Sequence, residues 1–384
     1  MKKLLKGIAI VISVLMLIIS IGVLGKDEWL ITQIATISFP EMFSWVLIIS
    51  LLFLAIGIYK LAKEKWNLKA LSKTSVTIIL LSAICFAATS IEFVHYRNAI
   101  VKNGADVTIL SGMNAVGKMG VPDEKVVYAT KEGEELSISI YKPEQENLKE
   151  LRPIYVYVHG GGWSNGNSES NANYHQMMRE EGYVSFSINY RLATDDRPTW
   201  DKQIEDVNDA MKWIYKNAKI YGGDPERIFL SGESAGGNLA LVYGGRVSEG
   251  SLDGPMPKAL TVMYPAIDLQ WTSENARFMT PSNIPGFVET YIGGNLYDYP
   301  DRVKAINPLT FINENLPPVL IIHGQKDTMV TINGSREYIS DLERLGVRNQ
   351  LAEIPFSNHN TSAKVNFDIT MSFLKGIKGM RINK

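Results

Sequence analysis

The stretch RIFLSGESAGGNLAL, residues 227–241, joins a short apolar strand to a helix-forming segment through a Gly-x-Ser-x-Gly turn. This order predicts a nucleophile elbow, in which Ser234 lies in a strained turn and exposes its hydroxyl at the start of a helix. Gly232 and Gly236 leave room where side chains would clash with the strand and the helix. Amide N–H groups at the helix end favour developing negative charge. The alternative is a tight turn whose serine only caps the helix.

Short β-branched runs alternate with helical stretches on both sides of this turn. Several runs are apolar throughout, as is typical of parallel strands that are covered on both faces. The alternation predicts an α/β fold, a mostly parallel sheet flanked by helices. The predicted strands are 126–128, 136–141, 154–158, 184–188, 228–230, 260–263, 319–322 and 350–354, and the predicted helices are 201–218, 234–247, 332–345 and 361–377.

A glycine-rich loop, HGGGW at residues 159–163, follows the predicted strand 154–158. Consecutive glycines let backbone N–H groups approach a ligand closely, and such donors stabilise the oxyanion of acyl transfer. We expect this oxyanion hole to use the N–H groups of Gly160, Gly161 and Ala235. His159 is expected to hold the loop rather than to act as a base. The GxxxxGK[ST] pattern of a phosphate-binding loop is absent.

A nucleophilic serine needs a general base, and the base needs an orienting carboxylate. His359 is the candidate base, because its loop between the last predicted strand and the last predicted helix can reach over the sheet. Asp327 follows the preceding strand, so both side chains can converge at the carboxyl edge of the sheet. Asp268, which also follows a strand, is the alternative acid.

An insertion at about 269–307 is rich in aromatic residues. One interpretation is a cap that covers the site and offers an apolar pocket for the acyl or alcohol group. The other is ordinary packing of a helical insertion. Trp163 and Glu233, next to the glycine loop and the serine, are expected to line the substrate pocket.

Three long apolar runs, at about 4–24, 42–59 and 74–94, precede this region. Each approaches the roughly 20 residues that a helix needs to cross a bilayer. They predict three transmembrane helices in an anchor over 1–95, followed by a connector over 96–125 and a hydrolase domain over 126–384. A cleaved signal peptide is the alternative for the first run.

Lysines are distributed unevenly around these runs. The N-terminus and the second loop hold eight lysines, whereas the first loop holds one lysine together with three acidic residues. Short cytoplasmic loops collect Lys and Arg, so the N-terminus and second loop are expected in the cytoplasm. Three crossings then predict a multi-pass protein of the cell membrane with an extracytoplasmic catalytic domain.

Composition excludes several classes of protein. The 384 residues carry 39 basic and 40 acidic side chains, so nothing indicates nucleic acid as a partner. The single cysteine, Cys85, allows neither an intrachain disulfide nor a cysteine-based metal site. We expect no metal and no cofactor.

Together these motifs resemble the hormone-sensitive-lipase-like esterases of the α/β-hydrolase superfamily. Glu233 stands where that group usually has Asp, so the elbow is also similar to that of the carboxylesterase type. The resemblance covers about 126–377 and implies an α/β-hydrolase fold and a carboxylesterase or related deacylase without a cofactor. The matching stretches are HGGGW at 159–163, NYRLA at 189–193, GGDPER at 222–227, GESAGGN at 232–238 and HGQKD at 323–327.

The sequence therefore predicts a serine hydrolase that cleaves a small-molecule, lipid or carbohydrate ester through an acyl-enzyme intermediate. Rival hypotheses are a peptidase of the same fold, another deacylase, and a non-catalytic binding module. A binding module would be expected to lose the serine, the histidine or the glycines, yet all are present.

Overall fold

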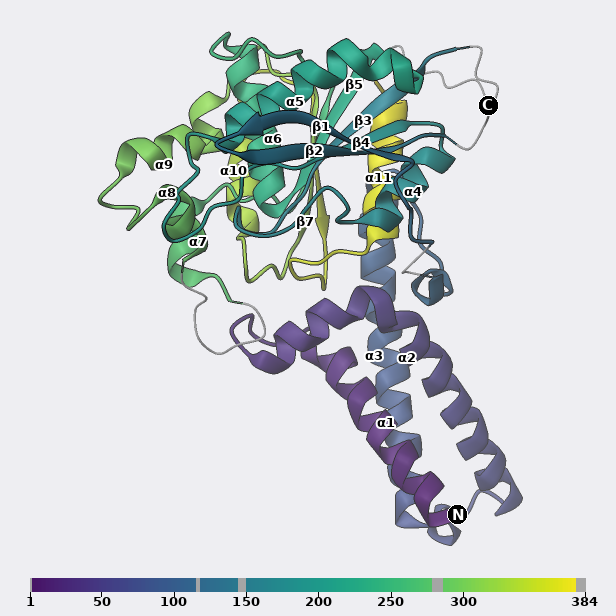
Figure 1. Ribbon diagram of the computed structural model, residues 1–384. Helices are drawn as coiled ribbons and strands as arrows, with labels where there is room; N and C mark the ends of the chain where they lie inside the picture. The colour runs from purple at the N-terminus through teal and green to yellow at the C-terminus, as the bar shows by residue number, and fades with distance from the viewer. Residues whose placement is uncertain (1, 115–117, 144–149, 278–285, 378–384) are drawn as a thin grey trace.

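The computed structural model describes residues 2–114, 118–143, 150–277 and 286–377 (Figure 1). An α/β part sits on a stalk of three long helices, and the N-terminus lies at the far end of the stalk. Part of the predicted cap insertion, residues 278–285, lies outside the described residues.

The α/β part is built on one eight-stranded sheet in the order β1-β2-β4-β3-β5-β6-β7-β8. Strands β3 to β8 run parallel to one another, and β1 and β2 are antiparallel at one side of the sheet. This arrangement confirms the predicted α/β fold. The strands are β1 (Glu124–Lys131), β2 (Glu134–Tyr141), β3 (Arg152–Val158), β4 (Val184–Ile188), β5 (Gly223–Glu233), β6 (Leu260–Met263), β7 (Val319–Gly324) and β8 (Asn349–Ile354).

Helices cover both faces of the sheet, which is why the central strands are apolar on both sides. In β3, Val156 faces a cluster that includes residues of α5, α6 and α10, whereas Tyr157 faces a cluster that includes residues of α4 and α11. The helices are α4 (Ala172–Glu180), α5 (Gln203–Asn217), α6 (Ser234–Ser248), α7 (Leu269–Asn275), α8 (Phe287–Ile292), α9 (Pro300–Ile306), α10 (Ile332–Arg344) and α11 (Ala363–Lys375).

The stalk consists of α1 (Lys2–Gly22), α2 (Leu30–Lys63) and α3 (Lys73–Lys102). All three are long and apolar enough to cross a membrane. Helix α2 begins well before the predicted run at 42–59, because Pro40 is accommodated inside it. Figure 1 shows α2 changing direction, as expected for a helix with an internal proline.

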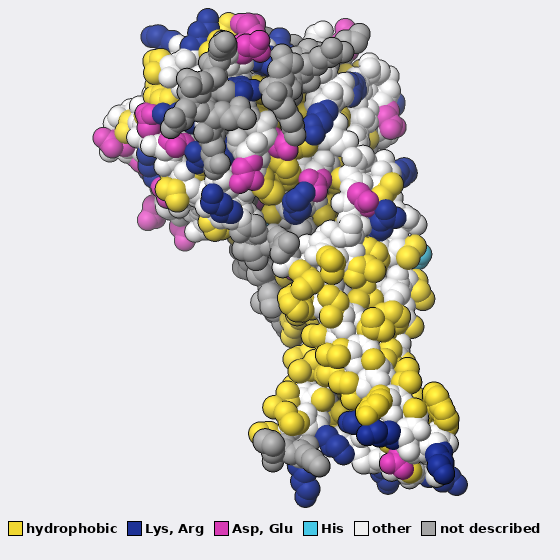
Figure 2. All heavy atoms as spheres, turned by 90° about the vertical axis from the view of Figure 1, so that its right-hand side faces the viewer, with side chains coloured by type: hydrophobic (Ala, Val, Ile, Leu, Met, Phe, Trp, Pro, Cys, Tyr) yellow, Lys and Arg dark blue, Asp and Glu magenta, His cyan; other side chains and the backbone are white. Residues whose placement is uncertain are grey.

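The surface of the stalk is divided by residue type. Apolar side chains cover its middle, and Lys side chains gather at the end far from the α/β part (Figure 2). The exposed apolar residues include Leu51, Leu52 and Ile58, and the exposed lysines include Lys60 and Lys63. A belt of this kind between two polar ends is typical of helices that lie in lipid.

The stalk and the α/β part share one apolar cluster. This cluster contains Phe39 and Tyr96 of the stalk together with Tyr157 of β3 and Leu374 of α11, and Phe356 packs against it. The bundle therefore continues into the packing that covers one face of the sheet.

Candidate active site

Ser234 lies where β5 ends and α6 begins, in the left-handed region of the backbone with φ +52°. Neighbouring backbone comes so close that only glycine fits on either side. A Cβ on Gly232 would lie 2.3 Å from Gly236 O, and one on Gly236 would lie 2.2 Å from Val158 O. The turn thus holds the serine hydroxyl at the carboxyl edge of the sheet, as the Gly-x-Ser-x-Gly spacing predicts.

His359 reaches Ser234 from the loop between β8 and α11. Its Nε2 lies 3.0 Å from Ser234 Oγ, and its Nδ1 lies 2.7 Å from Asp327 Oδ2. The Asp327 side chain is fully buried and that of His359 is 13% exposed. The three side chains predicted to converge therefore form one chain of hydrogen-bond contacts, although each follows a different strand.

The environment of Asp327 keeps its carboxylate ionised. Burial alone would raise its pKa, but attraction to His359 and hydrogen bonds from His323 and His359 outweigh burial and hold the pKa below its usual range. Its Oδ1 also accepts hydrogen bonds from the N–H groups of Met329 and Val330, both at 2.9 Å. Such a carboxylate can orient an imidazole and stabilise its cation.

Asp268, the alternative acid, has a different environment. Its Oδ1 accepts a hydrogen bond from Trp271 N at 2.9 Å and caps the first turn of α7. An N-cap carboxylate satisfies helix N–H groups that otherwise lack partners. The capping role thus explains why an aspartate stands at this position, and its side chain makes no hydrogen bond to His359.

The glycine-rich loop lies directly against the serine turn. A Cβ on Gly160 would approach Ser234 Cβ to 3.3 Å, and Gly161 has φ +117°, which a residue with a side chain rarely adopts. Ala235, the third expected donor, is buried in the first turn of α6. Gly160 and Ala235 therefore lie beside Ser234, and Gly161 follows Gly160 in the same loop. The role of the three N–H groups as an oxyanion hole stays a prediction.

His159 packs inside this loop rather than toward the serine. Its Nδ1 lies 2.7 Å from Gly160 O, and its ring stacks on Tyr190 with 4.3 Å between centroids. The Tyr190 hydroxyl donates to His159 O at 2.9 Å. Burial lowers the pKa of His159, which favours the neutral ring, and these contacts fix the shape of the loop.

Glu233 and Tyr264 form a hydrogen-bonded pair beside His359, and sequence reasoning missed this pair. The Tyr264 hydroxyl donates to Glu233 Oε2 at 2.7 Å, and the Tyr264 ring lies 4.6 Å from the His359 ring. Burial raises the pKa of Tyr264 well above its usual value, so the hydroxyl keeps its proton. Tyr264 directly follows β6, and this position at the carboxyl edge was the one signal that could have identified it.

Asn358 was also missed, although it directly precedes the candidate base. It is fully buried, and its Oδ1 accepts hydrogen bonds from His359 N at 2.8 Å and from Thr328 N at 3.1 Å. Thr328 follows Asp327, so Asn358 connects the loop of the candidate acid to that of the candidate base. Nothing in the local sequence indicates this burial.

A small cavity of about 30 Å³ adjoins Ser234. Trp163 lines it and stacks on Tyr291 of α8 with 4.8 Å between centroids. Phe287, from the same helix, lines another side, so part of the predicted insertion borders the cavity beside the serine. The lining residues are Gly162, Trp163, Ser234, Ala235, Ala266, Thr272, Phe287, Met329 and Val330. Glu233, which was also expected to line the pocket, does not line this cavity.

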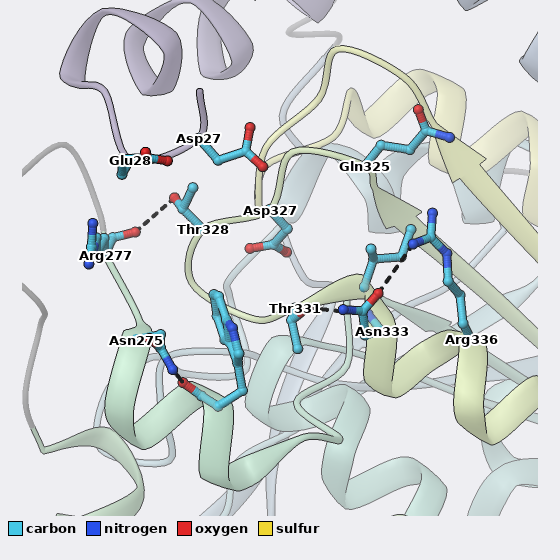
Figure 3. Close-up of a pocket in the computed structure, with 12 residues that line it drawn as sticks. Asp27, Glu28, Asn275, Arg277, Gln325, Asp327, Thr328, Thr331, Asn333 and Arg336 are labelled. Carbon is cyan, nitrogen blue, oxygen red and sulfur yellow. Dashed lines mark hydrogen bonds between the residues drawn. The ribbon is translucent and has the colours of Figure 1, made fainter. Parts of the chain in front are cut away.

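A larger polar cavity of about 590 Å³ is lined in part by residues of the loop after β7, among them Asp327 and Thr328 (Figure 3). Asp27 and Glu28, from the connection between α1 and α2, form another part of its wall. The stalk therefore contributes directly to the surroundings of the candidate site. Among the described residues, no group of three or more His, Cys, Asp or Glu side chains could hold a metal ion.

Comparisons with known proteins identify the family and the fold of this chain. Residues 138–342, more than half of the chain, match the family described as BD-FAE. Esterase LipQ of Mycobacterium tuberculosis is 32% identical over 212 residues, which cover 54% of this chain and 50% of LipQ. Arylacetamide deacetylase of Oryctolagus cuniculus is 35% identical over 206 residues, which cover 51% of this chain and 49% of that protein.

This chain thus spans about half the length of the curated relatives it matches. Among solved structures, the thermophilic esterase Est2 of Thermogutta terrifontis with bound propionate has a TM-score of 0.54 at 21% identity, covering 68% of this chain and 96% of Est2. At that identity the likeness concerns the fold alone, and the shared fold is that of the α/β-hydrolases.

Proposed function

This chain belongs to the BD-FAE family, and from that membership we propose that it is a serine hydrolase that cleaves carboxylic esters through an acyl-enzyme intermediate. The observation that carries the proposal is the chain of contacts from Ser234 Oγ through His359 to the buried Asp327, at 3.0 and 2.7 Å. Relatives named as esterases and a deacetylase support the same reaction class. The substrate is an ester of a small molecule, a lipid or a carbohydrate.

In the proposed reaction, His359 takes the hydroxyl proton of Ser234 as the serine oxygen attacks the ester carbonyl. The tetrahedral oxyanion accepts hydrogen bonds from the N–H groups of Gly160, Gly161 and Ala235. The His359 cation, stabilised by Asp327, then protonates the leaving alcohol, and the acyl group remains on the serine. Water repeats the sequence with His359 as base, which releases the carboxylic acid and the free serine.

We also propose that α1, α2 and α3 anchor the protein in the cell membrane, with the hydrolase domain outside the cytoplasm. The basis is the apolar belt of the stalk and the lysines at its far end. The proposed division is an anchor over 1–95, a connector over 96–125 and a catalytic domain over 126–384.

The test combines turnover with labelling of the serine. Purified full-length protein should hydrolyse p-nitrophenyl acetate, and Ser234→Ala should lower kcat by at least about 10³-fold, because the nucleophile is lost. A membrane-impermeant fluorophosphonate should label intact cells that carry the wild type but not those that carry Ser234→Ala. Turnover by Ser234→Ala near the wild-type rate would refute the proposed nucleophile, and labelling only after cell lysis would refute the proposed orientation.

A further inference from the structure

The first turns of α2 lie against the loop that carries His359. Thr36 accepts two hydrogen bonds from Asn358, one from the backbone N–H to Thr36 O at 3.3 Å and one from Nδ2 to Thr36 Oγ1 at 3.1 Å. Both residues are fully buried. A stalk helix therefore holds the residue next to the proposed base by two hydrogen bonds.

Pro40 explains why the carbonyl of Thr36 is available. In an α-helix, the carbonyl of residue 36 would accept the N–H of residue 40, but proline has no N–H to donate. The Asn358 N–H takes the place of this missing donor. The Thr36 hydroxyl is arranged in a similar way, because it donates to Thr32 O at 2.8 Å and leaves its oxygen free to accept from Asn358.

On its other side, Asn358 holds both loops of the proposed catalytic machinery. Its Oδ1 accepts from His359 N and from both the N–H and the hydroxyl of Thr328, the residue after Asp327. One side chain thus connects α2, the base loop and the acid loop. A displacement of α2 would be transmitted to His359 and Asp327 together.

Further contacts between the stalk and these two loops fix the same geometry. Phe39 of α2 packs on Phe356 of the base loop with 5.5 Å between ring centroids. On the acid loop, Lys326 forms a 2.7 Å ion pair with Asp27 and donates to Gly25 O at 3.2 Å. Each loop is therefore attached to the stalk by its own contact as well as through Asn358.

We infer that Thr36 is a positioning residue, and that α2 sets the placement of His359 and Asp327 through Asn358. The stalk then does more than attach the hydrolase to a membrane, because it completes the support of the site. This inference rests on the proposed function, since it assigns Thr36 a part in the same hydrolysis.

The central experiment compares threonines one helical turn apart, in full-length protein reconstituted in nanodiscs. Thr36→Val keeps the shape but removes the acceptor for Asn358 Nδ2, so kcat for p-nitrophenyl acetate should fall about 10-fold with KM unchanged, because small displacements of catalytic groups are costly. Thr36→Ser should recover most of this loss. Thr32→Val is the matched control, because Thr32 Oγ1 is buried and has no hydrogen-bond partner among the described residues; it should keep the wild-type kcat.

A backbone variant tests the same link without touching Thr36. Pro40→Ala supplies an N–H that competes with Asn358 for the Thr36 carbonyl, while it removes a residue that weakens helices. We expect kcat to fall several-fold while the thermal midpoint rises or stays the same. A purely structural role would move stability and turnover in the same direction, and this variant also decides the matter if Thr36→Val folds poorly.

The outcomes separate the inference from the proposed function. If wild type is active and Ser234→Ala is inactive, but Thr36→Val and Pro40→Ala both keep the wild-type kcat, the inference is wrong and the proposed function stands. Equal losses in Thr36→Val and Thr32→Val would also overturn it. If Ser234→Ala itself remains active, the proposed function is wrong, and the inference that rests on it is wrong with it.

Discussion

Backbone strain differs between the two edges of the sheet. At the amino ends of β4, β5 and β8, the left-handed positions are taken by glycines, namely Gly182, Gly222 and Gly346. At the carboxyl ends of β3, β5, β6 and β8 the same backbone region is occupied by residues with side chains, namely Trp163, Ser234, Tyr264 and Phe356. Both edges need tight turns, but the amino edge uses glycine at these positions, whereas the carboxyl edge uses residues with side chains in addition to Gly161 and Gly162.

The difference shows where a residue with a side chain is kept although its backbone conformation is unfavourable. A residue other than glycine in this region costs about 1–3 kcal/mol, and such strain gathers at functional sites. Ser234 presents its hydroxyl, Trp163 lines the small cavity, and the Tyr264 ring packs on His359. Phe356 packs on α2. The carboxyl edge therefore keeps costly conformations because each of these side chains has a contact that glycine could not make.

The largest effect is expected at Asp327, which is compared with Asp268, because both follow strands at the carboxyl edge. Asp327→Asn should lower kcat by a factor of the order of 10⁴, because an amide no longer holds the required tautomer of His359. Asp268→Asn is the matched control, since Asn caps helices as well as Asp does, and it should keep both kcat and stability. Steady-state kinetics on p-nitrophenyl acetate measures both variants. A larger loss in Asp268→Asn would transfer the role of acid to Asp268.

The next largest effect, on stability, is expected at His175. This histidine lies away from the carboxyl edge and is fully buried between Tyr141 and Tyr157. Burial lowers its pKa to about 3, whereas an unfolded histidine titrates near 6.5. Between these values only the unfolded chain takes up the proton, so the contribution of His175 to stability is present above about pH 6.5 and is lost as pH falls. From pH 6.5 to pH 5 the loss should be about 2 kcal/mol.

Thermal midpoints of the wild type and His175→Gln between pH 7.5 and pH 5 check this expectation. The wild type should lose more stability on acidification than the variant does. Parallel decreases in the two proteins would show that other groups cause the acid sensitivity.

A smaller effect is expected at the cavity beside Ser234, which at about 30 Å³ has room for little more than a methyl group. Phe287→Ala removes one wall and should raise kcat/KM for p-nitrophenyl butyrate relative to acetate by about 10-fold, since each added methylene can then be buried. Tyr297→Ala is a suitable control, because Tyr297 belongs to the same insertion but is 61% exposed. An unchanged butyrate-to-acetate ratio in Phe287→Ala would place the acyl group elsewhere.

The smallest effect tests the amino edge. Gly222→Ala puts a Cβ where no heavy atom lies within 4 Å, so the only penalty is the left-handed backbone at φ +79°. The free energy of unfolding should fall by about 1 kcal/mol, whereas kcat should not change. Denaturation and turnover of the same preparation measure the two quantities. A loss of kcat would contradict the separation between the two edges.

The elements that depend on local pattern were predictable from the sequence. The strands 184–188 and 260–263 have the predicted bounds, because short runs of buried β-branched residues are bounded by turn residues. The turn at Ser234 was predictable because its glycines are required by contacts within a few residues of the serine and at the adjacent strand. His359 and Asp327 followed from their loops at the same edge.

The supports of the site could not be predicted, because they join residues distant in the chain. The contact between Thr36 and Asn358 spans more than 300 residues, and neither residue belongs to a motif. The early start of α2 was missed for a related reason. Pro40 normally ends a helix, and the hydrogen bond that compensates for its missing N–H comes from Asn358, which sequence periodicity does not reveal.

The direction of the parallel strands has a consequence for the supply of substrate. Their carboxyl ends point toward the stalk, and the ion pair of Lys326 with Asp27 opposes rotation of the α/β part about it. Trp29 and Ile31, at the start of α2, are exposed, whereas Thr36 of the same helix is buried against Asn358. Under the proposed anchoring, an ester dissolved in the bilayer reaches the α/β part by lateral diffusion, so turnover should follow its density per unit of membrane area rather than its concentration in the bulk.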